Sequence, residues 1–403
     1  MTFSKEQITK FNSLETPFYY YDIDLLKRTL EELTKESLKR NYKIHYALKA
    51  NSNDRILKII SSSGLGADCV SGNEITKAIE TGFKNDEIVF AGVGKSDKEI
   101  KTALKNNISC FNVESIQELE VINSISSAIN KIAQIAIRIN PNVDANTHHY
   151  ITTGLEENKF GINTWELSAI LERLPSLKNI NLIGLHFHIG SQISDLHVFK
   201  GLCIRINEIQ KWFDEHKLNL QYINVGGGLG INYEIPDAEL IPDFGSYFNV
   251  FEKFLEIDPG QQVHFEIGRA IVGQCGSLIS RVLYIKEGVN TNFAILDAGM
   301  TELIRPALYQ SYHKIENISN SETLPTGRQV QNLKSAIHKY DVVGPICESS
   351  DTFGKSILLP ETKRGDLIAI LSTGAYGEAM ASRYNLRSEV DSYYSDQLSI
   401  SQD

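Results

Sequence analysis

The chain has 403 residues, with 50 Asp and Glu against 40 Lys and Arg, so its formal net charge at pH 7 is −10. This length exceeds one ordinary domain unless that domain is a barrel, and it predicts two domains with a sizeable core. The acidic balance argues against a nucleic-acid partner, because binding to phosphates requires a basic face.

The cysteines and the N-terminus predict a cytoplasmic protein with no membrane partner. The five cysteines are scattered and include no C-x-x-C pair, so the sequence predicts neither a metal site nor a disulfide framework. Free thiols are typical of the reducing cytoplasm. The first residues lack the apolar run of a signal peptide, and no segment reaches the roughly 18 apolar residues of a membrane helix.

Up to about residue 275, short β-rich runs alternate with longer helix-permissive stretches, a pattern typical of βαβ units around a parallel sheet. Eight such repeats close a (β/α)8, TIM-like barrel; an open doubly wound sheet is the alternative. The expected strands are Ile44–Leu48, Leu65–Val70, Glu87–Ala91, Ser109–Val113, Ile135–Ile139, Ile183–Ile189, Tyr222–Val225 and Val263–Ile267. Expected helices include Asp54–Ser62, Gly72–Thr81, Ser96–Lys105 and Glu114–Ile125.

Beyond residue 275, strand-like runs follow one another without regular helices, which predicts a C-terminal β-rich domain. The run Pro17–Asp22 is expected to add a strand to it. The expected domains are a barrel over residues 24–272 and a β-rich domain made of residues 1–23 plus 273–403. The polar stretch Ser319–Ala336 predicts a surface loop. The expected strands of the second domain are Gly276–Lys286, Asn292–Leu296, Lys339–Val343 and Asp366–Leu371.

Residues capable of chemistry recur near the carboxyl ends of the expected barrel strands, where the working groups of such barrels lie. Lys49 ends the first strand, and partial desolvation there would favour the neutral amine that forms a Schiff base. Taken alone, this position is better explained by an ordinary solvated lysine, since perturbed lysines are uncommon. The other residues in such positions are Asp68, Arg138, His188, Ser191, the Gly226–Gly230 loop, Glu266 and Arg269.

The glycine-rich loop Gly226–Gly230 predicts a phosphate site, because backbone without side chains can approach an anion closely; a tight turn is the alternative. Ser191 and Arg269 would complete the site with a hydroxyl and a fork of donors. Glu266 would keep a pyridine nitrogen protonated and make the ring an electron sink, unless it forms a salt bridge with Arg269. His188 would stack on such a ring, or it is a hydrogen-bonded core residue.

The β-rich domain contributes further candidates. Cys347 lies beside carboxylates in Gly344–Asp351; it would protonate a carbanion, or it is a small buried hydrophobe. Arg305 and Tyr309 would share one face of a helix. Tyr376 lies in a glycine-flanked loop, where a packing aromatic is the alternative.

Taken in order, these motifs resemble the fold-type III pyridoxal-phosphate decarboxylases over nearly the whole chain, and most closely the diaminopimelate branch of that family. Each motif is weak alone, and their order makes the signal specific. The matching stretches are Tyr46–Asn51, Asp68–Gly72, Lys159–Gly161, His186–Gln192, Gly226–Gly230, Glu266–Arg269, Cys347–Asp351 and Gly374–Tyr376.

The resemblance implies that Lys49 holds pyridoxal 5'-phosphate as an internal aldimine, that His188 stacks on the ring and that Glu266 faces its nitrogen. It implies that Cys347 donates a proton from the other subunit of a head-to-tail homodimer, so that the active site is shared across the interface. The further cofactor-binding residues implied by the resemblance are Asp68, Ser191, Gly226, Gly227, Gly228, Gly268, Arg269 and Tyr376.

The implied reaction is decarboxylation of meso-2,6-diaminopimelate to L-lysine and CO2, the last step of lysine biosynthesis. The far end of this substrate requires a cation for its carboxylate and an anion for its ammonium group. The implied substrate-binding residues are Arg269, Arg305, Tyr309, Glu348 and Tyr376.

Three alternatives remain at this point. One is a decarboxylase of a related basic amino acid or of carboxynorspermidine, and another is a non-catalytic pyridoxal-phosphate-binding or regulatory homologue. The third is a racemase on a similar barrel; racemases resemble this chain but have an arginine at the pyridine nitrogen, so Glu266 favours decarboxylation.

Two features depart from the family pattern. Ile267 occupies a position where proline is usual, and Ser319–Ala336 looks longer than typical and is expected to be a mobile surface insertion.

Overall fold

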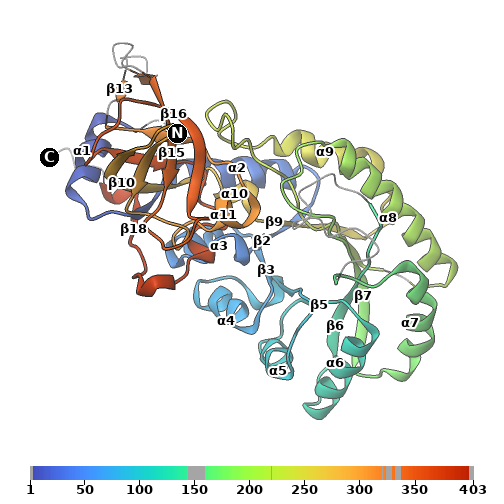
Figure 1. The fold of residues 1–403 in the computed structure, drawn as a ribbon. Helices are drawn as coiled ribbons and strands as arrows, with labels where there is room; N and C mark the ends of the chain where they lie inside the picture. The colour runs from blue at the N-terminus through green and yellow to red at the C-terminus, as the bar shows by residue number, and fades with distance from the viewer. Residues whose placement is uncertain are drawn as a thin grey trace. The chain divides into compact units, whose positions relative to one another are not determined.

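The computed structural model describes residues 3–143, 159–218, 220–319, 321–323, 329–331 and 337–398. The chain forms two compact units, shown in Figure 1. One unit consists of Leu30–Gly230 and Asp243–Arg269, and the other of Met1–Thr29, Ile231–Pro242 and Ala270–Asp403.

The first unit is a closed barrel of parallel strands, which confirms the predicted (β/α)8 architecture over the open sheet. The barrel closes where the first strand pairs with the last, with Ile44 opposite Phe265. All eight predicted runs form its strands, with small shifts at their ends. These strands are β2 (Lys43–Ala47), β3 (Gly66–Cys69), β4 (Ile88–Phe90), β5 (Cys110–Val113), β6 (Ala133–Arg138), β7 (Ile180–His186), β8 (Tyr222–Asn224) and β9 (Gln262–Ile267).

Helices alternate with the strands and lie outside them (Figure 1). The four predicted helices α3 to α6 are confirmed, and the side chains of Asn53, Ser71, Ser96 and Ser115 cap their first turns, as expected for these residue types. The α-helices are α2 (Ile23–Leu38), α3 (Asp54–Ser62), α4 (Gly72–Glu80), α5 (Asp97–Lys105), α6 (Ile116–Ala128), α7 (Leu167–Arg173), α8 (His197–Glu215) and α9 (Phe244–Phe254). Short 3-10 helices are η1 (Leu48–Ala50), η2 (Asn85–Glu87), η4 (Thr164–Glu166) and η5 (Leu174–Ser176).

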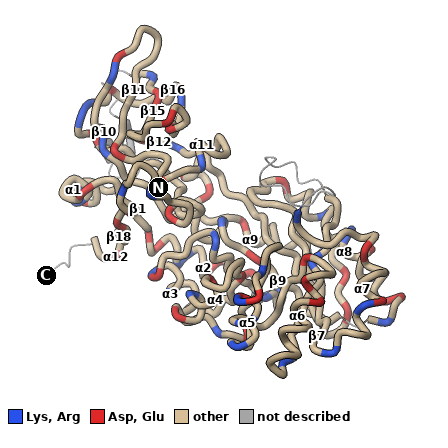
Figure 2. Tube along the Cα trace, turned by 60° about the horizontal axis from the view of Figure 1, so that its bottom comes forward, with Lys and Arg blue, Asp and Glu red and all other residues tan. Residues whose placement is uncertain are grey.

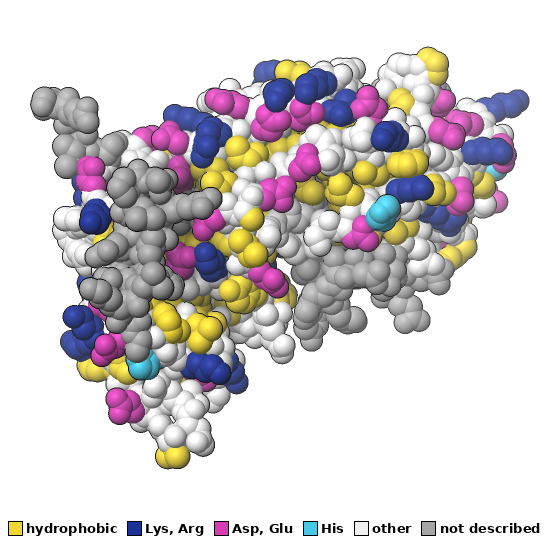
Figure 3. Space-filling model, turned by 90° about the horizontal axis from the view of Figure 1, so that it is seen from above, with side chains coloured by type: hydrophobic (Ala, Val, Ile, Leu, Met, Phe, Trp, Pro, Cys, Tyr) yellow, Lys and Arg dark blue, Asp and Glu magenta, His cyan; other side chains and the backbone are white. Residues whose placement is uncertain are grey.

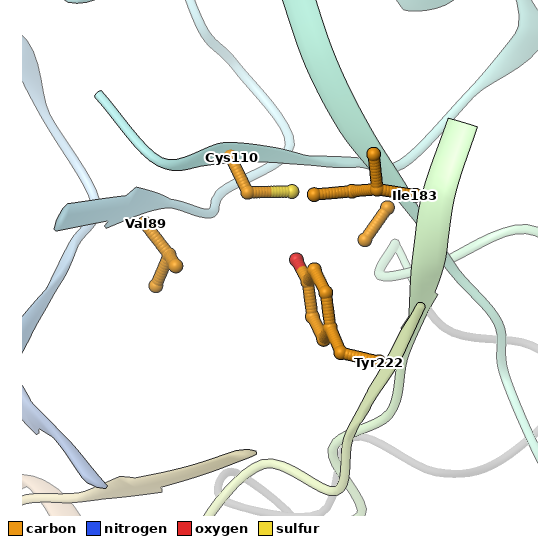
Figure 4. Packing of buried hydrophobic residues seen from close by; sticks show 5 residues of the cluster. Val89, Cys110, Ile183 and Tyr222 are labelled. Atoms are coloured by element: carbon orange, nitrogen blue, oxygen red, sulfur yellow. The ribbon is translucent and has the colours of Figure 1, made fainter. Parts of the chain in front are cut away.

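The interior of the barrel is packed rather than open. Val89, Cys110, Ile183 and Tyr222 point toward one another from four strands (Figure 4), and together with Ala136 they form one buried cluster. Cys110 and Tyr222 each precede an asparagine by two residues on the same strand. Because side chains of a strand alternate between faces, those asparagines share the interior face, nearer the carboxyl ends.

The second unit contains an eight-stranded sheet with the order β12-β17-β10-β11-β15-β16, to which β1 and β18 are added. The predicted N-terminal strand is confirmed, since β1 pairs antiparallel with β10. The strands are β1 (Phe18–Tyr21), β10 (Gly276–Glu287), β11 (Asn292–Leu296), β12 (Ile315–Asn317), β15 (Ile337–Val343), β16 (Thr352–Pro360), β17 (Leu367–Ile370) and β18 (Ser392–Tyr394). Its helices are α1 (Lys5–Ser13), α10 (Arg269–Val272), α11 (Arg305–Tyr309), α12 (Ser395–Leu398), η6 (Glu378–Met380) and η7 (Tyr384–Leu386), of which α10 begins at the last residue of the barrel unit.

The segment Ile231–Pro242 falls within the sequence range expected for the barrel and belongs to the β-rich unit. Its backbone is held there by Gln274, whose Nε2 donates to the carbonyls of Pro236 at 3.1 Å and Glu239 at 2.7 Å. A buried side-chain amide that satisfies two loop carbonyls fixes such a segment firmly.

Part of the expected loop Ser319–Ala336 forms strands instead. β13 (Ser321–Thr323) pairs antiparallel with β14 (Gln329–Gln331). Backbone hydrogen bonds can join two polar strands without an apolar pattern, so the composition did not predict them. Residues 320, 324–328 and 332–336 of this stretch lie outside the described residues, so its expected mobility stays a prediction.

Charged side chains of both signs are interspersed along the described trace of each unit (Figure 2) and on the face shown in Figure 3. All five cysteines are free thiols, four of them buried and Cys347 exposed. Among the described helices, none combines the length and the apolar character needed to span a membrane.

Candidate active site at the carboxyl ends of the barrel strands

Lys49 lies in η1, directly after β2, with its neighbours Leu48 and Ala50 buried. Its Nζ is 3.1 Å from Oδ2 of Asp68, and the lysine side chain is 38 % exposed while that of Asp68 is fully buried. Asp68 lies on the adjacent strand, opposite Ala47. The lysine amine is therefore held at a strand end while still reachable from solvent.

Asp68 sits in an unusual electrostatic environment. Burial raises the pKa of its carboxyl, the charge of Glu266 raises it further, and the ammonium of Lys49 lowers it. Its second oxygen, Oδ1, is buried without a hydrogen-bond partner among the described residues. The negative charge of Asp68 therefore depends on the cation beside it.

Glu266, on β9, is buried and held by three side chains. Asn112 and Asn224 donate to Oε1 at 3.1 and 2.8 Å, and Nε2 of His186 donates to Oε2 at 2.9 Å. Burial opposes ionisation, but the charge and hydrogen bond of His186 and the charge of Lys49 outweigh it and lower the pKa of Glu266. The carboxylate is thus ionised at neutral pH, as required to keep a pyridine nitrogen protonated.

The loop after β8 can only be built from glycine. Gly226 and Gly228 adopt φ of +72° and +111°, in the left-handed region that L side chains rarely enter. A Cβ on Gly226 would overlap the carbonyl oxygen of Phe187, and one on Gly227 would overlap that of Glu266. The backbone therefore passes close to both neighbouring strands.

Two of the three amides of residues 226–228 already have acceptors. Gly226 N–H donates to Oδ1 of Asn224 at 2.9 Å, and Gly227 N–H to Nδ1 of His188 at 3.3 Å. The N–H of Gly228 has no acceptor among the described residues. An anion bound here would find one open backbone donor.

Ser191 and Arg269 lie beside this loop. Nε and Nη2 of Arg269 donate to Oγ of Ser191 at 3.3 and 3.0 Å. The segment that carries Ser191 is tied to the glycine loop, because Ile193 N donates to the carbonyl of Gly228 at 2.8 Å. A buried guanidinium, a hydroxyl and an open amide form a donor set suited to a phosphate.

His188 follows β7, and its Nδ1 accepts the Gly227 amide, which leaves the ring proton on Nε2. Burial lowers the pKa of His188 strongly, and the charges of Arg138 and Lys49 lower it further. The imidazole is therefore neutral at pH 7, and a neutral ring can stack on an electron-poor ring without charge repulsion.

Arg138, another residue expected near the site, is engaged in a buried ion pair. Its Nη1 is 2.8 Å from Oε1 of Glu114, and its guanidinium lies 4.8 Å from the centre of the Phe160 ring. Glu114 also accepts the amides of Gly92 and Gly161. This arrangement fixes the loops after β4 and β6; residues 144–158, which follow β6, lie outside the described residues.

The departure of the eighth strand from the family pattern, Ile267, is accommodated without local disruption. Ile267 is 2 % exposed and pairs with Tyr46 in regular register. Gly268 leaves no room for a side chain, because a Cβ would come within 2.9 Å of that of Ala50. Glu266 and Arg269 on either side keep their hydrogen bonds.

Arg305, Tyr309 and Tyr376 belong to the β-rich unit. Arg305 begins α11, confirming that it shares a helix with Tyr309, and its Nη1 lies 2.9 Å from Tyr233 Oη and 3.2 Å from His313 Nε2. Tyr376 is half-buried with φ of +57°.

Cys347 is exposed, so it is not the small buried hydrophobe considered as an alternative. Its amide donates to Oδ1 of Asn385 at 3.3 Å, and Glu348 accepts from Tyr384 Oη at 2.8 Å. The loop around it is shaped by Asp351, which accepts the amides of Met300 and Ile346. The thiol is thus presented to solvent on a hydrogen-bonded turn.

Sequence reasoning missed three residues of the barrel site: Asn112, His186 and Asn224. Each is a polar residue on an otherwise apolar buried strand, with at most 1 % exposure. Buried polar side chains need partners, so a polar residue near the carboxyl end of such a strand was the available signal.

We expect Gly227→Ala to weaken the phosphate end of the site, because the added Cβ overlaps the Glu266 carbonyl. The free energy of unfolding should fall by about 1–3 kcal/mol, measured by urea denaturation, and the Kd for pyridoxal phosphate should rise. Gly94→Ala is the matched control, since its Cβ meets nothing within 4 Å. Equal behaviour of the two variants would contradict this account of the loop.

Comparison with known proteins agrees with this geometry. The model of the pyridoxal binding domain of pyridoxal-dependent decarboxylases matches residues 24–273. The chain is 55 % identical over 392 residues to diaminopimelate decarboxylase of Bacteroides thetaiotaomicron, covering 97 % of this chain and 98 % of that protein. The chain belongs to the diaminopimelate decarboxylase family.

Other members of the family are similar in sequence and in fold. The diaminopimelate decarboxylase of Aquifex aeolicus is 38 % identical over 92 % of this chain and 84 % of its own length. The crystal structure of the Helicobacter pylori diaminopimelate decarboxylase complexed with L-lysine matches with a TM-score of 0.87 and 41 % identity, over 96 % of this chain and 93 % of that chain. This membership favours a decarboxylase over a racemase.

Proposed function

We propose that this chain decarboxylates meso-2,6-diaminopimelate to L-lysine and CO2, with pyridoxal 5'-phosphate as cofactor. The observation that carries the proposal is the arrangement in the barrel of a reachable lysine amine, an ionised buried carboxylate and an anion-binding loop. The relatives named above are diaminopimelate decarboxylases, and one was solved with the product L-lysine. The activity named for these relatives supports a role for this chain in the last step of lysine biosynthesis.

The residues of the barrel fit pyridoxal phosphate at both of its ends. The phosphate would be held by the Gly228 amide, the Ser191 hydroxyl and Arg269, with Gly226, Gly227 and Gly268 leaving the space that a side chain would fill. Glu266 would face the ring nitrogen, and His188 would lie against the ring. When bound, this cofactor supplies an electron sink for the carbanion left by loss of CO2.

The side chains of this chain then have distinct tasks. Lys49 would hold the cofactor through its amine, while Asp68 keeps the amine in position. Glu266 keeps a proton on the ring nitrogen because its own carboxyl stays ionised. The neutral imidazole of His188 would cover one face of the cofactor ring and exclude water from it without adding charge.

The second unit is proposed to complete the site from the partner in a homodimer. The exposed thiol of Cys347 would donate the proton to Cα, and Arg305 would bind the distal carboxylate of the substrate. Glu348 would bind the distal ammonium group, and Tyr309 and Tyr376 would line the site. A cytoplasmic location completes the proposal.

A mixing experiment tests the shared site. Lys49→Ala and Cys347→Ala are each expected to be inactive, because each removes one essential group from every site of its own homodimer. Mixing them under conditions that exchange subunits should restore CO2 release, since a mixed dimer contains one site with both groups. No recovery, despite subunit exchange shown by native mass spectrometry, would contradict a shared site.

Substrate choice is tested by measuring CO2 release from meso-diaminopimelate, L-lysine, L-ornithine, L-arginine and carboxynorspermidine side by side. We expect kcat/KM to be highest for meso-diaminopimelate, because only a substrate with a distal carboxylate uses Arg305. Preference for any other amine would redirect the assignment within the family, and no CO2 release from any of them would favour a binding-only homologue.

A further inference from the structure

The carboxylate of Glu266 is enclosed by donors from three different strands. Asn112 comes from β5, His186 from β7 and Asn224 from β8, and they are 0, 1 and 0 % exposed. Their donor atoms lie 3.1, 2.9 and 2.8 Å from the carboxylate oxygens. Asn112, His186 and Asn224 together form the Glu266 cage. Donors on separate strands hold the carboxylate against rotation as well as displacement.

The hydrogen bonds are divided unevenly between the two oxygens. Oε1 accepts both amides, whereas Oε2 accepts only from His186 among the described residues. A carboxylate oxygen offers about two lone-pair positions. Oε1 is therefore saturated, and Oε2 retains one position for a further donor.

We propose that Asn112, His186 and Asn224 are positioning residues that present the open lone pair of Oε2 to the protonated ring nitrogen of the cofactor. The inference rests on the proposed function, because it assigns that ring nitrogen as the missing donor. The three residues would touch neither substrate nor cofactor and would act through Glu266.

Asn224 links the two ends of the cofactor site. Its Oδ1 accepts the Gly226 amide at 2.9 Å while its Nδ2 donates to Glu266 at 2.8 Å. A backbone N–H can only donate and a carboxylate can only accept, so the orientation of the amide group is fixed by its partners. The same side chain thus orients the carboxylate and the start of the phosphate loop.

One residue of the cage, His186, also helps the buried carboxylate to stay charged. Burial on its own raises the pKa of Glu266, and the charge and hydrogen bond of His186 together with the charge of Lys49 outweigh it. Asp68 is a neighbouring acid, and the charge of Glu266 raises its pKa. Loss of a donor from the cage should therefore shift Glu266 toward its neutral form.

Four variants of the full-length protein test the cage. His186→Leu removes one donor, and His186→Gln keeps an N–H donor at a similar reach. Asn112→Asp replaces a donor by a second carboxylate of the same shape. Cys110→Ala is the control, because it lies two residues before Asn112 on β5, in the apolar cluster of Figure 4.

The first readout needs no cofactor. The carboxyl 13C resonance of Glu266, assigned by its absence in Glu266→Gln, is titrated in the apo protein. We expect Glu266 to be ionised through the neutral range in the parent chain, in Cys110→Ala and in His186→Gln. In His186→Leu and Asn112→Asp its pKa should rise by about one unit or more, the equivalent of a tenfold change in the ionisation equilibrium.

The second readout is the kinetics of the holoenzyme. His186→Leu and Asn112→Asp should lower kcat by about tenfold or more with little change in KM, and His186→Gln should recover most of the loss, since a loss of ring protonation acts on the chemical step. A purely structural role would instead lower the unfolding temperature without this split between kcat and KM.

The outcomes separate the cage from the proposed function. If the parent chain binds pyridoxal phosphate and releases CO2 but both donor-removing variants titrate and turn over like Cys110→Ala, the cage is wrong. If the parent chain does neither, the proposed function is wrong, and the apo titration still decides whether the cage controls Glu266. Should His186→Leu not fold, Asn112→Asp with its own apo titration carries the test.

Discussion

Replacing Lys49 by alanine is expected to abolish turnover and the visible absorbance of the bound cofactor. Its ammonium lies at the end of β2, 3.1 Å from the buried Asp68. Loss of the covalent attachment removes the path by which substrate displaces the enzyme's own amine. The measurement is the absorbance spectrum of the purified protein with pyridoxal phosphate, together with kcat, which we expect to fall by about 1,000-fold or more.

The matched control for this variant is Lys43→Ala. Lys43 is an exposed lysine at the opposite end of the same strand, so its removal changes the charge by the same amount. The control should keep both the spectrum and the activity. An unchanged cofactor band in Lys49→Ala would show that a different lysine holds the cofactor.

Replacing Glu266 by glutamine is expected to have the second-largest effect. The substitution keeps the shape of the side chain and removes the charge that stabilises a proton on the ring nitrogen. We expect kcat to fall by about 100-fold, with cofactor still bound through the phosphate donors at Ser191 and Arg269. Steady-state kinetics and fluorescence titration of the cofactor measure the two quantities separately.

The pH behaviour distinguishes Glu266 from other acids. Its pKa is lowered in the folded chain, so the stabilisation it contributes is present above its unfolded pKa and is lost only as pH falls through its folded pKa. The parent enzyme should therefore show no loss of kcat from this group between pH 5 and 8. A parent-like kcat in Glu266→Gln would contradict the role assigned to the carboxylate.

The sequence predicted the barrel well because its strands are short, buried and separated by well-capped helices. Runs such as Cys110–Val113 are buried at every position, which is typical of parallel strands covered on both faces. The same alternation of strands and helices predicted that Lys49, Glu266 and the glycine loop lie at strand ends, although it does not predict the contacts among them.

Other features of the fold and of the site could not be predicted from the sequence, for physical reasons. Asn112 and Asn224 look like ordinary strand residues until the barrel closes and brings them to Glu266, across 154 and 42 residues of sequence respectively. The hairpin of β13 and β14 lacks an apolar pattern. The segment Ile231–Pro242 joins the β-rich unit through side chains of residues far along the chain, such as Gln274.

The most direct test of the central claim is reductive trapping of the cofactor on the intact holoenzyme. Borohydride reduction followed by peptide mapping should place one pyridoxyl label per chain, on the peptide that contains Lys49. A label on any other lysine, or no label despite tight binding of pyridoxal phosphate, would contradict the assignment of this barrel end as the active site.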